Sequence, residues 1–294
     1  MADENVTERM ARLGYAARGT VYLIVGAFAV LAALGPGGRT TDQKGALQAV
    51  LGQPFGKILL GIMALGLFSF AIWRALQAVP DVDRCGHGAK ALVRRTAFAV
   101  SAVAHAGLAV WAVGALIGSG RGGGDADQSA HDWTAALLAA PFGQWLVAAA
   151  GIIVAATGIA VGVRGWKGTF AERLVLTEQN RRWVIPMGRF GFLARAVVFL
   201  LIGAFLIMAA AHTSAQEAKG LAGALKVLQD QPHGWFLLGL TALGLFAFGA
   251  FQFVTAVYRR IDAPGLHKAA AEVQRSAQAA GQHVSEALRE RHRP

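Results

Sequence analysis

The chain has 294 residues, of which 55% are hydrophobic and 15% are charged, and its formal net charge is +11. A soluble domain carries about 25% charged residues, so this composition excludes an ordinary soluble enzyme, a disordered chain and a collagen. In a membrane protein an excess of lysine and arginine reflects topology rather than nucleic-acid binding, so we expect no nucleic-acid partner.

Six apolar stretches are each long enough to cross a bilayer as an α-helix. In chain order they cover residues 13–34, 58–79, 96–117, 142–163, 190–211 and 235–257. At 1.5 Å per residue, 22 residues extend about 33 Å, against a hydrocarbon core of about 30 Å. The first stretch exceeds the apolar region of a signal peptide and is interpreted as an uncleaved first helix. The sequence therefore predicts an all-α polytopic membrane protein with six transmembrane helices.

The basic residues are distributed unequally between the two sides of this predicted membrane protein. The segments between paired stretches hold six of the 28 lysines and arginines, and the other 22 lie on the opposite side. By the positive-inside rule, the side with 22 faces the cytoplasm. We therefore expect both termini to lie in the cytoplasm.

An internal repeat divides the chain into three units. The sequence RLGYAAR at 12–18 recurs 177 residues later as RFGFLAR at 189–195, and a weaker middle copy begins 83 residues after the first, at Arg95. The second helix of every unit begins with Pro-Xaa-Gly, at Pro54, Pro141 and Pro232. The predicted organisation is a cytoplasmic N-terminus (1–11), unit 1 (12–80), unit 2 (94–164), a cytoplasmic linker (165–188), unit 3 (189–258) and a basic cytoplasmic tail (259–294).

Each unit contains two helices, so successive units enter the membrane in the same orientation. Parallel repeats of this kind are related by an axis along the membrane normal, which predicts a pseudo-threefold bundle of three helical hairpins. The outer loops carry short segments such as 46–51 and 221–228, for which we expect interfacial helices that end before the proline.

These motifs resemble the bacterial membrane proteins grouped as domain-of-unknown-function family 1206. The resemblance covers residues 12–258 and implies three tandem two-helix domains in the bacterial inner membrane, with no assigned activity. The middle unit departs from the motif, because Ser101 stands where the other two units have an arginine.

Three arginines lie at one depth inside the apolar stretches. Arg18 and Arg195 are five residues into their spans and Arg74 is five residues before the end of its own, about 7–8 Å inside the cytoplasmic boundary. No aspartate or glutamate occurs in the six stretches. The arginines are candidates for binding lipid or another anion. We favour outward or interface positions, where arginine reaches lipid phosphates, over a shared anion site.

His105 lies near the middle of the third stretch and is a candidate haem ligand or proton relay. The repeat register aligns it with Tyr22 and Phe199, which favours packing in an aromatic layer with one hydrogen bond. The residues Asp81, Asp83, Cys85 and His87 form a poor ligand set, because structural zinc sites present paired cysteines or histidines. We interpret them as a solvated loop and expect no metal and no cofactor.

Three functions remain open. We favour a non-enzymatic scaffold, or a module that binds membrane lipids, a membrane protein or a second copy of the chain. The alternative is a transporter or channel for a small solute or anion along the pseudo-threefold axis, and the third hypothesis is a haem-binding redox subunit. No serine–histidine–aspartate arrangement, acid pair, metalloprotease motif or phosphate-binding loop occurs in the sequence.

Overall fold

The computed structural model describes residues 2–35, 40–83, 88–118 and 127–261. It contains six helices with the length and hydropathy of membrane spans, as the sequence predicts. They are α1 (Ala2–Leu34), α3 (Gly56–Ala78), α4 (Ala89–Leu116), α6 (Gly143–Lys167), α7 (Glu178–Ala211) and α9 (Gly234–Tyr258). Helix α7 begins inside the segment interpreted as a linker, because Thr177 caps it by accepting a hydrogen bond from the Asn180 amide at 3.3 Å.

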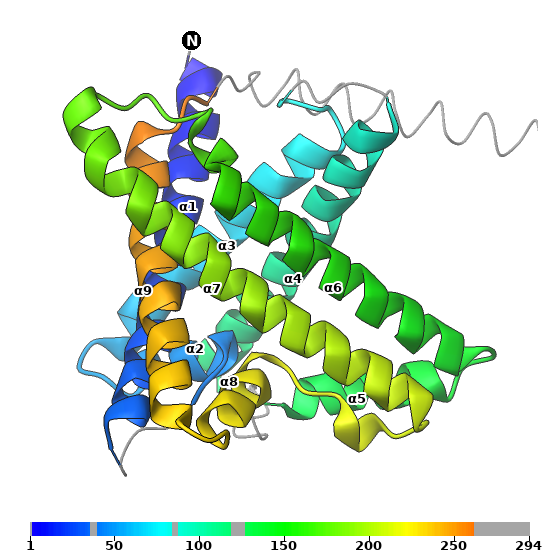
Figure 1. The fold of residues 1–294 in the computed structure, drawn as a ribbon. Helices are drawn as coiled ribbons and strands as arrows, with labels where there is room; N and C mark the ends of the chain where they lie inside the picture. Colours follow the sequence, from blue (N-terminus) through cyan, green and yellow to red (C-terminus); the bar gives the residue numbers. More distant parts are fainter. Residues whose placement is uncertain (1, 36–39, 84–87, 119–126, 262–294) are drawn as a thin grey trace, which may run out of the picture.

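The six long helices form a ring in the order α1, α3, α4, α6, α7, α9 (Figure 1). The most extensive interfaces join one unit to the next: α1 with α9, α3 with α4, and α6 with α7. Within units 1 and 3 the two helices also pack on each other, whereas α4 and α6 of unit 2 hardly touch. The ring therefore has the predicted repeat arrangement and is open at unit 2.

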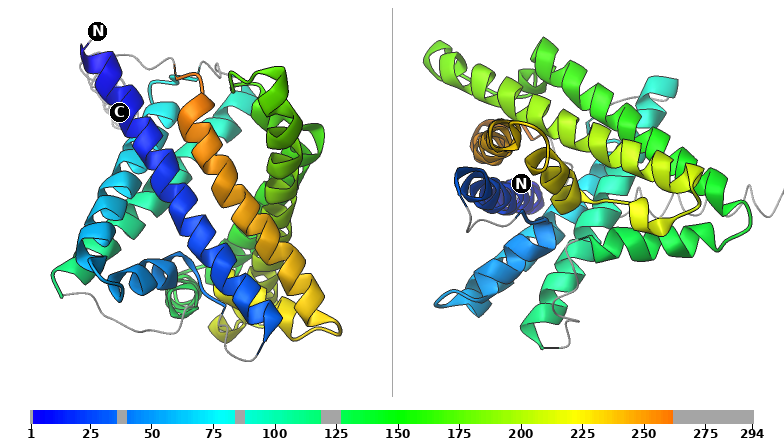
Figure 2. Two further views of the ribbon diagram at one scale, coloured as in Figure 1. Left: turned by 90° about the vertical axis from the view of Figure 1, so that its left-hand side faces the viewer. Right: turned by 60° about the horizontal axis from the view of Figure 1, so that its bottom comes forward.

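The two sides of the ring differ. The N-terminal end of α1 and the C-terminal end of α9 lie on one side, which we name the terminal side (Figure 1). Three short helices lie on the other, the short-helix side (Figure 2). They are α2 (Gln43–Leu51), α5 (Gln128–Leu138) and α8 (Leu221–Gln229), and each ends before the proline of its unit, as expected.

Glycines at equivalent positions set the helix crossings within units 1 and 3. A Cβ atom at Gly14 would lie 2.7 Å from the Cα atom of Phe70, and one at Gly191 would lie 2.7 Å from the Cα atom of Phe248. The Pro-Xaa-Gly motifs align Phe70 with Phe248, 178 residues later, as they align Pro54 with Pro232. Both crossings are thus the same contact, which only glycine permits at this backbone separation.

In units 1 and 2, the arginine that begins the unit binds the end of the second helix of the adjacent unit. Arg12 donates to the carbonyl oxygens of Ala256 and Val257 at 2.5 and 2.6 Å. Arg95 donates to those of Ala78 and Val79 at 2.7 and 2.6 Å. The two pairs of acceptors are equivalent in the register, and the donors satisfy carbonyls that a helix end leaves unpaired. This contact links unit 3 to unit 1 and unit 1 to unit 2.

Unit 2 lacks the small residues that close the other units. In unit 1 Gly66 lies against the methyl group of Ala17, and in unit 3 Gly244 lies against that of Ala194. Their counterparts in unit 2 are Ile153 and Val100, which are both 64% exposed. A branched side chain on each helix prevents the close approach that a glycine and an alanine allow. The separation of α4 from α6 therefore follows from the sequence of unit 2.

The short-helix side is closed by polar links between the three short helices. Lys44 of α2 donates to the hydroxyl of Ser129 of α5 at 2.5 Å, and Asp127 accepts from the amide of Gly220, which precedes α8, at 2.8 Å. Leu47 and Leu225 are fully buried beneath these links. Asp42 caps α2 on this side, and burial raises the pKa of its carboxyl above the ordinary value.

Candidate functional site

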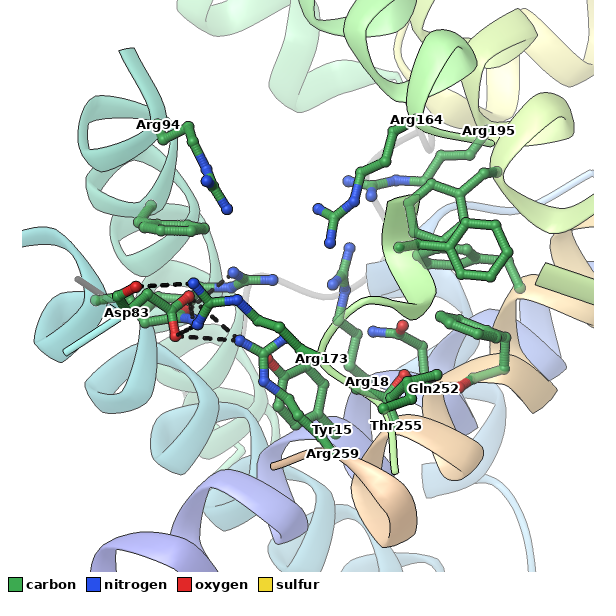
Figure 3. A pocket seen from close by; sticks show the side chains of 18 residues that line it. Tyr15, Arg18, Asp83, Arg94, Arg164, Arg173, Arg195, Gln252, Thr255 and Arg259 are labelled. Atoms are coloured by element: carbon green, nitrogen blue, oxygen red, sulfur yellow. Dashed lines mark hydrogen bonds and ion pairs between the residues drawn. The ribbon is translucent and has the colours of Figure 1, made fainter. Parts of the chain in front are cut away.

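A cavity with an empty volume of about 600 Å³, including the part open to solvent, lies on the terminal side of the ring (Figure 3). All six long helices contribute to its lining. Tyr15, Phe98 and Phe192 occupy one equivalent position in units 1, 2 and 3, and all three line it. The cavity therefore lies on the pseudo-threefold axis.

Arginines dominate the lining. Seven line the cavity: Arg18, Arg74, Arg94, Arg164, Arg173, Arg195 and Arg259. Asp83 is the only carboxylate among the lining residues, so seven positive charges and one negative charge give a formal charge of +6. Like charges in a region of low dielectric constant repel one another strongly. This arrangement creates a strongly positive potential inside the ring.

Of the outward or interface positions that we favour for Arg18, Arg74 and Arg195, the outward position is wrong. All three line the cavity. Arg18 and Arg195 are equivalent positions of units 1 and 3, so the repeat turns both toward the axis. The position of an arginine in the sequence does not by itself give the direction in which it points around its helix.

Aromatic rings form the floor beneath these arginines. The guanidinium carbon of Arg18 lies 5.1 Å from the ring centre of Phe70 and 5.2 Å from that of Phe248. The guanidinium carbon of Arg195 lies 5.0 Å from the ring of Phe248, and that of Arg74 lies 4.7 Å from the ring of Phe70. Cation–π contacts of this kind contribute about 2 kcal/mol or more when desolvated. They hold the cations in place without neutralising them.

Asp83 neutralises one wall of the cavity. Its carboxylate pairs with Arg173 and with Arg259, whose Nη2 atom lies at 3.2 Å, and accepts a hydrogen bond of 2.7 Å from Gln77. Gln77 in turn accepts from Arg74 at 2.9 Å. The side chain of Asp83 is only 7% exposed, so its interpretation as part of a solvated loop is wrong. Cys85 and His87 lie outside the described residues.

The opposite wall keeps its positive charge. Arg18, Arg94, Arg164 and Arg195 form no ion pair with any carboxylate in the described ranges. The Nε atoms of Arg18 and Arg195 are buried and have no hydrogen-bond partner among the groups that the structure describes. An unpaired buried donor on a charged group costs more than 1–3 kcal/mol. The Nε donors of Arg18 and Arg195 therefore lack an acceptor among the described groups, as do those of Arg74 and Arg259.

His105 packs against the aromatic ring of Phe70. Its ring centre lies 4.6 Å from that of Phe70, and its Nδ1 atom lies 2.8 Å from the carbonyl oxygen of Ser101. Within the described ranges, no group of three histidine, cysteine, aspartate or glutamate residues is placed to hold a metal ion. The geometry fits packing with one hydrogen bond, and the absence of metal binding stays a prediction.

We expect His105→Phe to preserve the fold. A phenyl ring retains the contact with Phe70 and loses one hydrogen bond, worth about 1 kcal/mol. The measurement is thermal unfolding of the detergent-solubilised protein together with its visible absorption spectrum. A haem band that is present in the wild type and absent in His105→Phe would instead support the redox hypothesis.

Several residues of the cavity cannot be identified from the apolar stretches alone, because they lie outside them. Arg164 lies one residue beyond the end of its predicted stretch, and Arg173 and Arg259 lie in the segments interpreted as linker and tail. The repeat register contains a signal for the first of these, because Arg164 aligns with Gln77 and Thr255, which also line the cavity. The basic tail, beyond residue 261, lies outside the described residues.

Comparison with known proteins agrees with the three units. A family model described as "Domain of Unknown Function (DUF1206)" matches residues 13–81, 96–168 and 190–259. A relative from Bacillus subtilis (strain 168), described as "Uncharacterized protein YxxB", is 34% identical over 257 residues, which is 86% of this chain and 92% of the relative. No solved structure matches the chain. These relatives do not indicate what the cavity binds.

Proposed function

The chain belongs to the DUF1206 family, whose function is not assigned, and from its cavity we propose that it is a membrane protein that binds an anion of the phosphate class. The observation that carries this proposal is the group of four arginines in one cavity, Arg18, Arg94, Arg164 and Arg195, without a carboxylate partner in the described chain. A bound anion would supply the missing negative charge and the missing acceptors.

The geometry of arginine favours phosphate over a small monatomic anion. A guanidinium group presents several N–H donors in a planar fork, which matches the spacing of two oxygens on one phosphate. A tetrahedral group with several charged oxygens accepts from more than one arginine at the same time. Arg18 and Arg195 approach the cavity from two helices, so such a group can bridge units 1 and 3.

The lining favours binding over catalysis. Asp83, its only carboxylate, is held by two arginines and a glutamine, so it is poorly placed to act as a base. A protein that binds an anion without converting it fits the polar groups of the cavity. We further propose that the terminal side faces the cytoplasm, because the sequence pattern assigns 22 of the 28 lysines and arginines to the same side of the membrane as the two termini.

Pyrophosphate tests the proposed function directly. In a maltoside detergent, which carries no phosphate, the purified wild type should bind pyrophosphate with measurable heat in isothermal titration. The variant Arg18→Gln should bind at least tenfold more weakly, a loss of about 1.4 kcal/mol. The control is Arg182→Gln, which removes an exposed arginine outside the cavity and should bind like the wild type. Equal binding by Arg18→Gln and the wild type would contradict the proposal.

A second candidate function is transport of the same anion, and a second cavity favours it. This cavity has an empty volume of about 400 Å³ and is lined by Tyr22 and Arg195 together with Gln43, which begins α2 on the short-helix side. Arg195 lines both cavities, so it lies between the terminal side and the short-helix side. Saturable phosphate flux into liposomes that is lost in Arg195→Gln would favour transport over binding alone.

A further inference from the structure

We propose that the anion is the headgroup of an anionic phospholipid, which enters the cavity sideways from the membrane between α4 and α6. This inference rests on the proposed function and names the source of the phosphate. A lipid differs from a free anion in having acyl chains, so it needs an apolar path that connects the cavity with the bilayer.

The wall of the cavity is open between α4 and α6. These two helices hardly touch, yet Arg94 and Phe98 of α4 and Arg164 of α6 all line the cavity. Figure 3 shows Arg94 and Arg164 on opposite sides of this opening, with their guanidinium groups directed into the space between them. A headgroup that passes between the helices would meet these two arginines first.

The helices that border the opening have apolar, lipid-accessible surfaces. Each long helix contains an apolar segment of 18 residues. The buried share of this segment is 11% in α4 and 17% in α6, compared with 50% in α1 and 56% in α9. Val100 and Val103 of α4 are 64% and 75% exposed, and Ile153 of α6 is 64% exposed. These side chains lie within the spans, so the surroundings of the opening are suited to acyl chains rather than water.

The charges of the cavity fit a lipid with a phosphate group at this depth. Acyl chains that lie along α4 and α6 would leave the phosphate near the ends of the spans, where Arg94 and Arg164 are located. From there the cavity continues to Arg18 and Arg195, whose Nε atoms are buried and unpartnered among the described groups. A neutral lipid would not supply the negative charge that this arginine group lacks.

Photochemical labelling distinguishes a lipid from a free phosphate. The probe is phosphatidylglycerol with a diazirine in one acyl chain, added to the protein in maltoside detergent and mapped by mass spectrometry. We expect labels on α4 and α6 that decrease at least fivefold in an Arg18→Gln, Arg195→Gln double variant and on addition of pyrophosphate. The control Arg182→Gln should be labelled like the wild type, and an uncharged diazirine diacylglycerol should not label α4 and α6 selectively.

A second variant closes the opening while keeping the arginines. This variant combines three substitutions, Ala97→Gly, Val100→Ala and Ile153→Gly. At these positions unit 2 then carries the same residue types that pack closely in unit 1 at the equivalent positions, Gly14, Ala17 and Gly66. We expect this triple variant to reduce lipid labelling at least threefold and to keep the wild-type affinity for pyrophosphate, which reaches the cavity from the terminal side.

The outcomes separate the two proposals. If pyrophosphate binds in an arginine-dependent manner but lipid labelling of α4 and α6 does not depend on the arginines, the lipid inference is overturned and the proposed function stands. If neither pyrophosphate nor lipid binding depends on them, the proposed function fails as well. A second copy of the chain found across α4 and α6 by native mass spectrometry of the lipid-bound protein would also overturn the lipid inference.

Discussion

Replacing Arg195 by glutamine is expected to stabilise the ligand-free protein and to remove most of its affinity for a phosphate anion. Arg195 lies beside Arg18 in a cavity with a formal charge of +6, and its Nε atom is buried and unpaired among the described groups. Removing one uncompensated buried charge relieves repulsion and desolvation, and we expect this relief to exceed the loss of the cation–π contact with Phe248, so that the free energy of unfolding rises. The same change removes donors that the anion needs.

The expected gain in ligand-free stability and the expected loss of phosphate affinity have opposite signs, and this difference distinguishes a binding role from a structural one. We expect Arg195→Gln to raise the melting temperature without ligand and to lose the additional stabilisation that pyrophosphate gives the wild type. Arg18→Gln should behave in the same way, and the effects of the two substitutions on affinity should not add, because both arginines bind one anion. Lower stability of both ligand-free variants would show that these arginines are structural.

Replacing Gly14 or Gly191 by leucine is expected to give the largest loss of stability. A Cβ atom at either glycine would lie 2.7 Å from the backbone of the partner helix, so the helices of unit 1 or unit 3 must separate. Overpacking of this kind costs about 1–3 kcal/mol, and we expect the upper part of that range because backbone rather than side chain is displaced. The measurement is the melting temperature and the monodisperse yield in detergent.

Unit 2 supplies the matched control for this substitution. Ala97 is the counterpart of Gly14 in the repeat register, but it is exposed on α4, which hardly contacts α6. We therefore expect Ala97→Leu to change the melting temperature little. If Ala97→Leu and Gly14→Leu were equally destabilising, the open wall between α4 and α6 would be in doubt.

The spans and the three units could be predicted because they depend on patterns that the sequence carries directly. Apolar stretches of about 22 residues set the six spans, and the repeated arginine and Pro-Xaa-Gly motifs set the register of the units. The departure of unit 2 was also visible as Ser101 in place of arginine. The opening at unit 2 has its own signal in Val100 and Ile153, which is found only after the second helices are aligned.

The inward direction of the arginines could not be predicted from depth alone. Hydropathy places a residue along a span, but its direction around the helix depends on which neighbour the helix packs against, and here the closest neighbours belong to different units. The pairing of Asp83 with Arg173 and Arg259 depends on loop conformation across a sequence separation of 90 residues or more, for which no local pattern exists. Both the inward direction of the arginines and the pairing of Asp83 therefore depend on tertiary contacts.

The central claim is that a phosphate group occupies the arginine cavity. The most direct measurement is an electron cryomicroscopy structure of the protein in nanodiscs that contain phosphatidylglycerol, at a resolution that shows guanidinium groups. Our account predicts density for a tetrahedral group within hydrogen-bond distance of Arg18 and Arg195, continuous with acyl-chain density between α4 and α6. Density that contains only water, or a segment of the chain itself with a carboxylate between the two arginines, would contradict it.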